Sequence, residues 1–196
     1  MVEVVRCFIC VELEEKIRKK ISRWIEELKI LAPRLKWVSE EGLHITLKFC
    51  GEINLSKVIK LENALQDAFA RETIGSFDLE IAGVGAFPGL REPRVLWLGI
   101  GGEEDQLVRI VEVVEGAAEV VGLEREHRPF HPHVTIARVK SPSDVPVDLI
   151  RTISDHDLGQ LSWKVNGVTL MKSELKRTGS IYTPIAKYHL NQPEVS

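Results

Sequence analysis

Apolar residues recur along this chain at two different spacings, which separate expected strands from expected helices. Helical three- and four-residue steps mark two segments, residues 13–29 and 55–71. In the first, Ile17, Ile21, Trp24, Ile25 and Leu28 would share one helix face. The helices are expected at residues 13–29, 55–71, 103–121 and 144–155. Runs rich in Val, Ile and Phe predict strands. These are expected at residues 4–12, 36–38, 44–51, 76–87, 95–101, around His133, and at 160–175 and 181–190.

The order of these elements is mixed, with some strands joined by turns and others by helices. This order predicts an α+β fold with antiparallel sheets and helices on one face. A helix followed by a strand with the same short motif occurs in both halves of the chain. We therefore expect an internal duplication, in which two similar lobes face each other across a pseudo-twofold axis. The repeat distance is longer than the roughly 20 to 50 residues of solenoid repeats.

The repeated motif is His, any residue, Thr, then an aliphatic residue. It occurs as His44-Ile45-Thr46-Leu47 and as His133-Val134-Thr135-Ile136. Because alternate side chains of a strand share a face, each copy presents an imidazole beside a hydroxyl.

The same alternation makes further predictions for the first motif strand. Lys48 is expected on the face of His44 and Thr46. Phe49 is expected in the core with Ile45.

Two histidines that converge on one groove suit acid–base chemistry. An imidazole with a pKa of roughly 6.5 is present in both protonation states near neutral pH, so one can accept a proton and the other can donate one. Threonine hydroxyls can donate hydrogen bonds to phosphate oxygens. A single H-x-T-x motif on a half-exposed strand is unremarkable, but two copies favour a catalytic site that requires no metal.

Composition narrows the function further. The formal net charge is −3, whereas a protein that coats nucleic acid is usually strongly basic. Binding to the end of a nucleic acid remains possible, because few charges need neutralising there. The three cysteines, Cys7, Cys10 and Cys50, are expected to be buried, unpaired thiols. No segment has the apolar length of a membrane span and the N-terminus does not resemble a signal peptide, so a cytoplasmic location is expected.

The sequence resembles a known family at several points. The segments "RCFICVEL", "HITLKFCGE", "GAFPGLREPRVLWLGI", "RPFHPHVTIAR" and "LMKSELKRTGSIYTPI" look like landmarks of the 2H phosphoesterase superfamily. The closest resemblance is to the RNA 2',3'-cyclic phosphodiesterases, also called 2'-5' RNA ligases. It implies a single bilobal domain over residues 1–196, with antiparallel sheets lining a central cleft and helices on the outer faces.

The resemblance also implies an activity: metal-independent hydrolysis of RNA 2',3'-cyclic phosphate ends to a 2'-phosphate, without a cofactor. His44 and His133 would be the general acid and base, and Thr46 and Thr135 would hold the phosphate. We favour His133 as the base that activates water and His44 as the acid for the O3' leaving group, although the two roles are nearly symmetric. A weak reverse reaction, 2'-5' ligation of RNA, is implied as well.

Five other residues are candidate substrate contacts. Arg138 follows the second motif, but strand alternation places it opposite His133 unless the strand bulges. Arg6 can line the cleft from its strand, and Lys48 can add positive charge to it. Phe130 and Tyr182 can stack on a base.

Other interpretations stay open. His131 with His133 and His44 can supply three imidazoles to a metal, but that leaves the threonines without a role. A non-catalytic nucleotide- or RNA-end-binding module of the same fold is one alternative. A phosphodiesterase for 2',5'-linked oligonucleotides is another, and a structural RNA partner is a third. The expected ligands are RNA 3' ends with a 2',3'-cyclic phosphate, or nucleotides. We expect the protein to be a monomer, with no protein partner and no membrane association.

Overall fold

Nine strands and four helices make up the fold of a computed structural model, which describes residues 3–156, 158–176 and 179–190. The strands are β1 (Val4–Glu12), β2 (Lys36–Trp37), β3 (His44–Asn54), β4 (Phe77–Phe87), β5 (Val95–Gly102), β6 (His133–Arg138), β7 (Ser162–Val165), β8 (Gly167–Lys176) and β9 (Gly179–His189). The helices are α1 (Glu15–Leu31), α2 (Leu55–Arg71), α3 (Glu104–Val120) and α4 (Leu149–Asp155), with short 3-10 turns at Glu40–Gly42 and Pro142–Asp144. Most expected elements are therefore confirmed.

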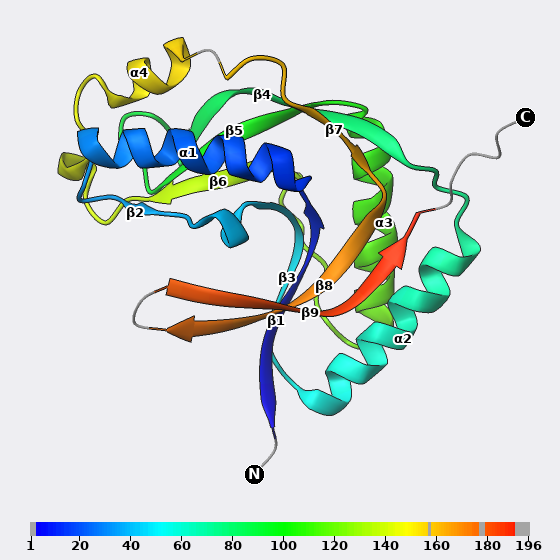
Figure 1. The fold of residues 1–196 in the computed structure, drawn as a ribbon. Coiled ribbons are helices and arrows are strands. Elements are labelled where there is room, and N and C mark those ends of the chain that lie inside the picture. Colours follow the sequence, from blue (N-terminus) through cyan, green and yellow to red (C-terminus); the bar gives the residue numbers. More distant parts are fainter. Residues whose placement is uncertain (1–2, 157, 177–178, 191–196) are drawn as a thin grey trace, which may run out of the picture.

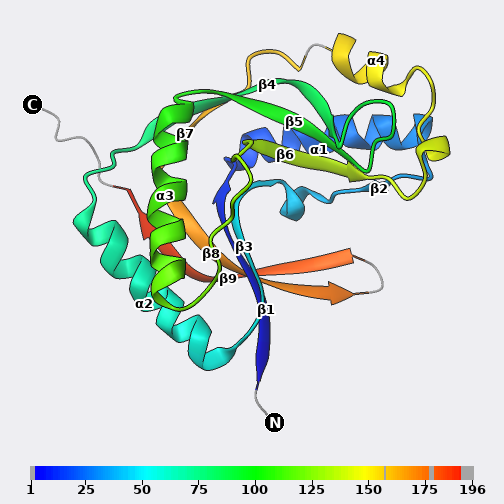
Figure 2. The ribbon, with the colours of Figure 1, turned by 180° about the vertical axis from the view of Figure 1, so that it is seen from behind.

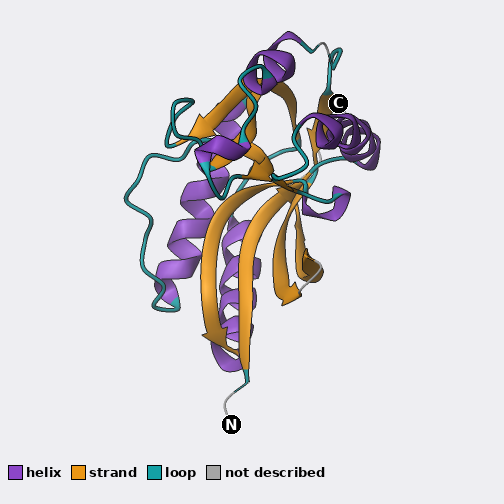
Figure 3. Cartoon of the chain, turned by 90° about the vertical axis from the view of Figure 1, so that its left-hand side faces the viewer, coloured by secondary structure: helices purple, strands orange, loops and turns teal. Residues whose placement is uncertain are grey.

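Every strand pairing within the described residues is antiparallel, and the strands form one sheet in the order β7-β4-β5-β6-β3-β1-β8-β9, with β2 beside β6. Figure 3 shows that its long strands are curved. This arrangement confirms the α+β class. We expected separate sheets, but the two motif strands, β3 and β6, join the halves through the pair Ile45 and Val134. The two motifs therefore lie at the junction of two four-stranded halves.

One expected strand is divided in two. Residues 160–175 form β7 and β8, which are separated at Asn166. β7 pairs with β4 and β8 pairs with β1, so the chain passes from one half of the sheet to the other at this residue. The run of apolar residues does not reveal this change of partner, since both strands contribute buried residues to the main core.

Helices cover the two halves of the sheet separately. α2 and α3 pack against each other and against the half that contains β1, β3 and β9 (Figure 1). α1 lies beside the other half, as Figure 2 shows from behind, and α4 packs against β4. The buried residues of α1 are the five expected from its spacing: Ile17, Ile21, Trp24, Ile25 and Leu28. Burying each of these large side chains contributes roughly 1.5–3 kcal/mol, so the helix is held mainly by this face.

The three cysteines are buried and unpaired, as expected. In the part of the chain that the structure describes, no helix has the length and apolar character needed to cross a membrane.

Candidate active site at the junction of the motif strands

The junction of β3 and β6 explains why the motif is repeated. Ile45 lies directly opposite Val134 in antiparallel pairing. In that register the residue before Ile45 faces the residue after Val134, and the reverse holds on the other side. Each histidine is therefore placed across from the threonine of the other motif, and all four polar side chains are on one face of the sheet. An antiparallel pair of strands has a local twofold axis. Repeating the motif on both strands therefore places the same side chains on each side of that axis.

A small cavity lies over these side chains. It is lined by Val38, Gly42, His44, Thr46, His133, Thr135, Arg138 and Tyr182. Its volume is about 80 Å³, well below the roughly 300–1,000 Å³ of sites that enclose a drug-sized ligand. The cavity can therefore enclose a group such as a phosphate, while the rest of a nucleotide would lie outside it.

His44 is held between aromatic rings. The Phe8 ring stacks on it with centroids 4.7 Å apart, and the Tyr182 ring meets it edge-on at 5.6 Å. Burial lowers the pKa of His44 to about 4; the Glu12 carboxylate opposes this shift, while His133 and Arg138 add to it. A pKa this low favours the neutral form of His44 near pH 7.

His133 has a different environment. Its Nδ1 lies 2.7 Å from the carbonyl oxygen of His131, so in the neutral ring Nδ1–H donates to that oxygen and Nε2 keeps its lone pair. The Phe87 ring approaches His133 edge-on at 5.1 Å. Burial lowers the pKa of His133, the bond to His131 opposes the shift, and the charges of His131 and Arg138 reinforce it. A neutral imidazole with a free Nε2 is suited to act as a base.

Arg138 lines the cavity although strand alternation places it on the opposite face. Leu96 pairs with Ala137 but Trp97 pairs with Thr135, which leaves Ile136 as an extra residue in β6. This β-bulge puts Ile136 and Ala137 both in the core and returns Arg138 to the face of Thr135. The sequence predicted Arg138 on the opposite face unless the strand bulges, and the structure has this bulge.

A second bulge, in β3, contradicts the expectation for Lys48. Ile9 pairs with Lys48 but Cys10 pairs with Thr46, so Leu47 is an extra residue. Lys48 is thereby turned away from the face of His44 and is only 6% exposed. Its Nζ donates to Glu115 Oε2 at 2.7 Å and to the Glu124 carbonyl oxygen at 2.8 Å. The prediction that Lys48 adds charge to the groove is wrong.

The same bulge brings Phe49 out of the core, where it was expected, and leaves it 52% exposed. The Arg6 guanidinium carbon lies 4.4 Å from the centroid of the Phe49 ring. Arg6 therefore packs on Phe49 and is not among the residues that line the cavity.

The two candidate aromatic residues differ in position. Tyr182 lines the cavity, and its ring also contacts Phe8 edge-on at 5.6 Å. Phe130 is half-buried and packs against the main core, outside the lining of the cavity. Of the two, only Tyr182 is placed to contact a bound group.

Three residues of the site were missed by the sequence reasoning. Val38 and Gly42 line the cavity, and Phe8 lies beneath His44. A Cβ on Gly42 would come within 2.6 Å of Val38 Cγ1, so a larger residue would crowd this wall. These three residues reach the site only because particular strands become neighbours, and the local spacing of residues does not indicate which strands will pair.

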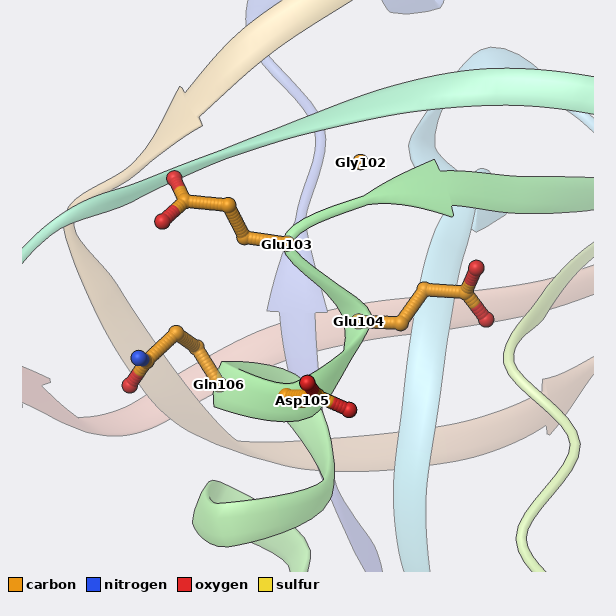
Figure 4. Close-up of a pocket in the computed structure, with 5 residues that line it drawn as sticks. All are labelled: Gly102, Glu103, Glu104, Asp105 and Gln106. Carbon is orange, nitrogen blue, oxygen red and sulfur yellow. The ribbon is translucent and has the colours of Figure 1, made fainter.

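A second hollow lies at the start of α3 and is lined by Gly102, Glu103, Glu104, Asp105 and Gln106 (Figure 4). Its carboxylates would repel a phosphate. In Figure 4 the side chains of Glu103 and Glu104 point to opposite sides. Across the described residues, no three His, Cys, Asp or Glu side chains gather as a metal ion would require, including around His131.

Comparison with known proteins places the chain in a family. Residues 17–177 match the model of the 2'-5' RNA ligase superfamily. The chain belongs to the 2'-5' RNA ligase superfamily. The family expected from the sequence is thus confirmed.

Two archaeal relatives carry the name RNA 2',3'-cyclic phosphodiesterase. The protein of Methanothermobacter thermautotrophicus is 35% identical, and the match covers 95% of this chain and 99% of the relative. The protein of Aeropyrum pernix is 38% identical, with 83% of this chain and 90% of the relative covered. The similarity therefore extends over most of the chain in both relatives.

Among solved structures, Escherichia coli LigT complexed with 3'-AMP is similar, with a TM-score of 0.72 and 28% identity, and the match covers 97% of this chain and 100% of LigT. A crystal structure of a phosphoesterase has a TM-score of 0.75 at 28% identity and covers 97% of this chain and all of that one. LigT has also been solved with ATP, NADP+ and phosphate. The shared fold is therefore one on which LigT binds nucleotides and phosphate.

Proposed function

We propose that this protein hydrolyses RNA 2',3'-cyclic phosphate ends to 2'-phosphates without a metal ion. The observation that carries the proposal is the convergence of His44, Thr46, His133 and Thr135 on a cavity of about 80 Å³. The names of the two archaeal relatives support the substrate class. Arg138, which also lines the cavity, adds a fixed positive charge for the phosphate.

In the proposed reaction, His133 Nε2 takes a proton from water while the water oxygen attacks phosphorus. The bond from phosphorus to O3' breaks, and His44 gives a proton to O3', so the phosphate remains on O2'. Thr46 and Thr135 donate hydrogen bonds to the non-bridging oxygens, on which negative charge accumulates. An RNA 5'-hydroxyl in place of water would form a 2'-5' linkage by the same step, so we propose weak ligation as a second reaction of this site.

His44 must be protonated to act as the acid, although its pKa in the protein alone is about 4. A bound phosphate anion favours the charged form of a nearby imidazole, so substrate binding raises this pKa. The Glu12 carboxylate acts in the same direction. Substrate binding thus favours the protonated form of His44, which the reaction requires as its acid.

We also propose that residues 1–196 form a single bilobal domain that arose by duplication. Each half of the sheet has its motif strand at the junction, in the orders β6-β5-β4-β7 and β3-β1-β8-β9. Each motif strand also has a bulge just after its threonine, at Leu47 and at Ile136. These shared features support a pseudo-twofold relation between the halves.

The test is turnover of a short RNA with a 2',3'-cyclic phosphate end, in the presence of EDTA. Wild type should produce a 2'-phosphate, and His44→Ala and His133→Ala should each lose at least about a hundredfold in rate. The matched control is His127→Ala, because His127 is an exposed histidine outside the cavity. Loss of activity on adding EDTA, or retention of activity in either catalytic variant, would reject the mechanism.

The alternative is a nucleotide- or RNA-end-binding module without turnover. It is favoured by the LigT structures with 3'-AMP, ATP and NADP+. Tight binding of the cyclic-phosphate RNA by folded wild-type protein without product would support it. Cleavage of 2',5'-linked oligonucleotides in preference to cyclic ends would support the other alternative substrate. A monomer and a cytoplasmic location remain predictions.

A further inference from the structure

Two cations lie side by side next to the cavity. Lys36 in β2 is directly opposite Arg138 in β6, and both side chains are exposed. Val38, two residues after Lys36, lines the cavity, whereas Trp37 between them is half-buried, with Nε1 donating to the Ala32 carbonyl oxygen at 2.9 Å. Lys36 therefore shares the face of Val38 and Arg138, at the edge of the sheet.

This pair lacks a counter-ion in the described residues. The neighbouring Arg34 pairs with Asp144 at 3.6 Å, but no carboxylate pairs with Lys36 or Arg138. Arg138 is flanked on its other side by Val95, which is apolar. Like charges directly opposite each other in a sheet destabilise it. An anion between the two side chains would remove that cost.

We propose that Lys36, beside Arg138, binds a second phosphate of the RNA: the phosphodiester that joins the terminal nucleotide to its 5' neighbour. This inference rests on the proposed function. The cavity has room for one phosphate, and Arg138 lies between that cavity and Lys36. Neighbouring strands are about 4.8 Å apart, so a chain that leaves the cavity over Arg138 next meets Lys36. The site would then prefer an RNA chain to a cyclic mononucleotide.

The test compares two substrates, a trinucleotide with a 2',3'-cyclic phosphate end and a mononucleoside 2',3'-cyclic phosphate. The measured quantity is the ratio of their kcat/KM values. Lys36→Met should lower this ratio about tenfold, because one charge-assisted contact is lost, and Lys36→Arg should retain most of it. The slope of log kcat/KM against log salt for the trinucleotide should become shallower by about 0.7, as for one single-strand phosphate contact.

Lys60→Met is the matched control, since Lys60 is an exposed lysine on α2 and should leave the ratio at the wild-type value. An unchanged ratio in Lys36→Met would overturn the proposal, whether both substrates are affected equally or neither is. If wild type hydrolyses neither substrate, the proposed function fails and the subsite is measured by binding. The Kd of a trinucleotide with a 2'-phosphate should then weaken more in Lys36→Met than that of a mononucleoside 2'-phosphate, and equal weakening would overturn it.

Discussion

Replacing Lys48 with Met removes one partner of a buried ion pair. The side chains of Lys48 and Glu115 are 5% and 4% exposed, and their Nζ and Oε2 atoms are 2.7 Å apart. Lys48 also donates to the Glu124 carbonyl oxygen. These contacts connect β3, which carries the first motif, to α3 and to the segment that leads to His133.

The expected cost of Lys48→Met is about 3–5 kcal/mol, because the Glu115 carboxylate would stay buried without a compensating charge. A typical domain has about 5–15 kcal/mol of stability, so this loss is a large part of the total. Adding Glu115→Leu should recover most of it, since an apolar pair can replace a buried ion pair at little cost. The double variant still lacks a donor to the Glu124 carbonyl oxygen and an acceptor for the Glu126 N–H, so its stability should remain below that of wild type.

The assay is equilibrium unfolding in urea at pH 7, with turnover measured on the folded variants. Lys164→Met is the control, because Lys164 and Asp78 form a pair 51% and 62% exposed; its effect should stay within about 1 kcal/mol. Two results would refute the reasoning. One is a cost for Lys48→Met no larger than the control's; the other is a double variant as unstable as the single one.

Three further predictions concern the histidines. The pH dependence of kcat/KM should have its maximum below pH 6.5, because the pKa values of His44 and His133 are both lowered in the free enzyme; a maximum above pH 7.5 would contradict this. The folded-state pKa of His44, about 4, is below the unfolded value, so the unfolded chain binds the proton first and stability falls as the pH drops from about 6.5 to 4. The loss should reach up to about 3 kcal/mol, and urea unfolding should show a smaller loss in His44→Gln. Phe8→Leu should raise the pKa of His44 toward 6.5 in an NMR titration, because the stacked ring that helps to exclude water is gone. An unchanged pKa would contradict this, since it would mean that neighbours other than Phe8 bury His44.

How far the sequence predicts this structure depends on the range of the interaction. The helices and the paired motifs follow from local spacing, and the buried face of α1 was predicted residue by residue. Lys48 and Phe49 were placed on the wrong faces because a bulge shifts alternation by one residue, and a bulge depends on the partner strand. The break at Asn166 was missed for a related reason, since it marks a change of partner. Tertiary pairing, which local patterns do not encode, decides these positions.

The twofold pairing of the motifs would give the two histidines equivalent roles if nothing else differed. Their surroundings differ, however. Phe8 and Tyr182 enclose His44, whereas the His131 carbonyl oxygen accepts from Nδ1 of His133. The bond at Nδ1 selects the tautomer of His133 that has its lone pair on Nε2, which a base requires. The strong burial of His44 makes its protonated form a stronger acid, which suits proton transfer to O3'. The asymmetry of the neighbours therefore supports His133 as base and His44 as acid, in a site whose backbone pairing is symmetric.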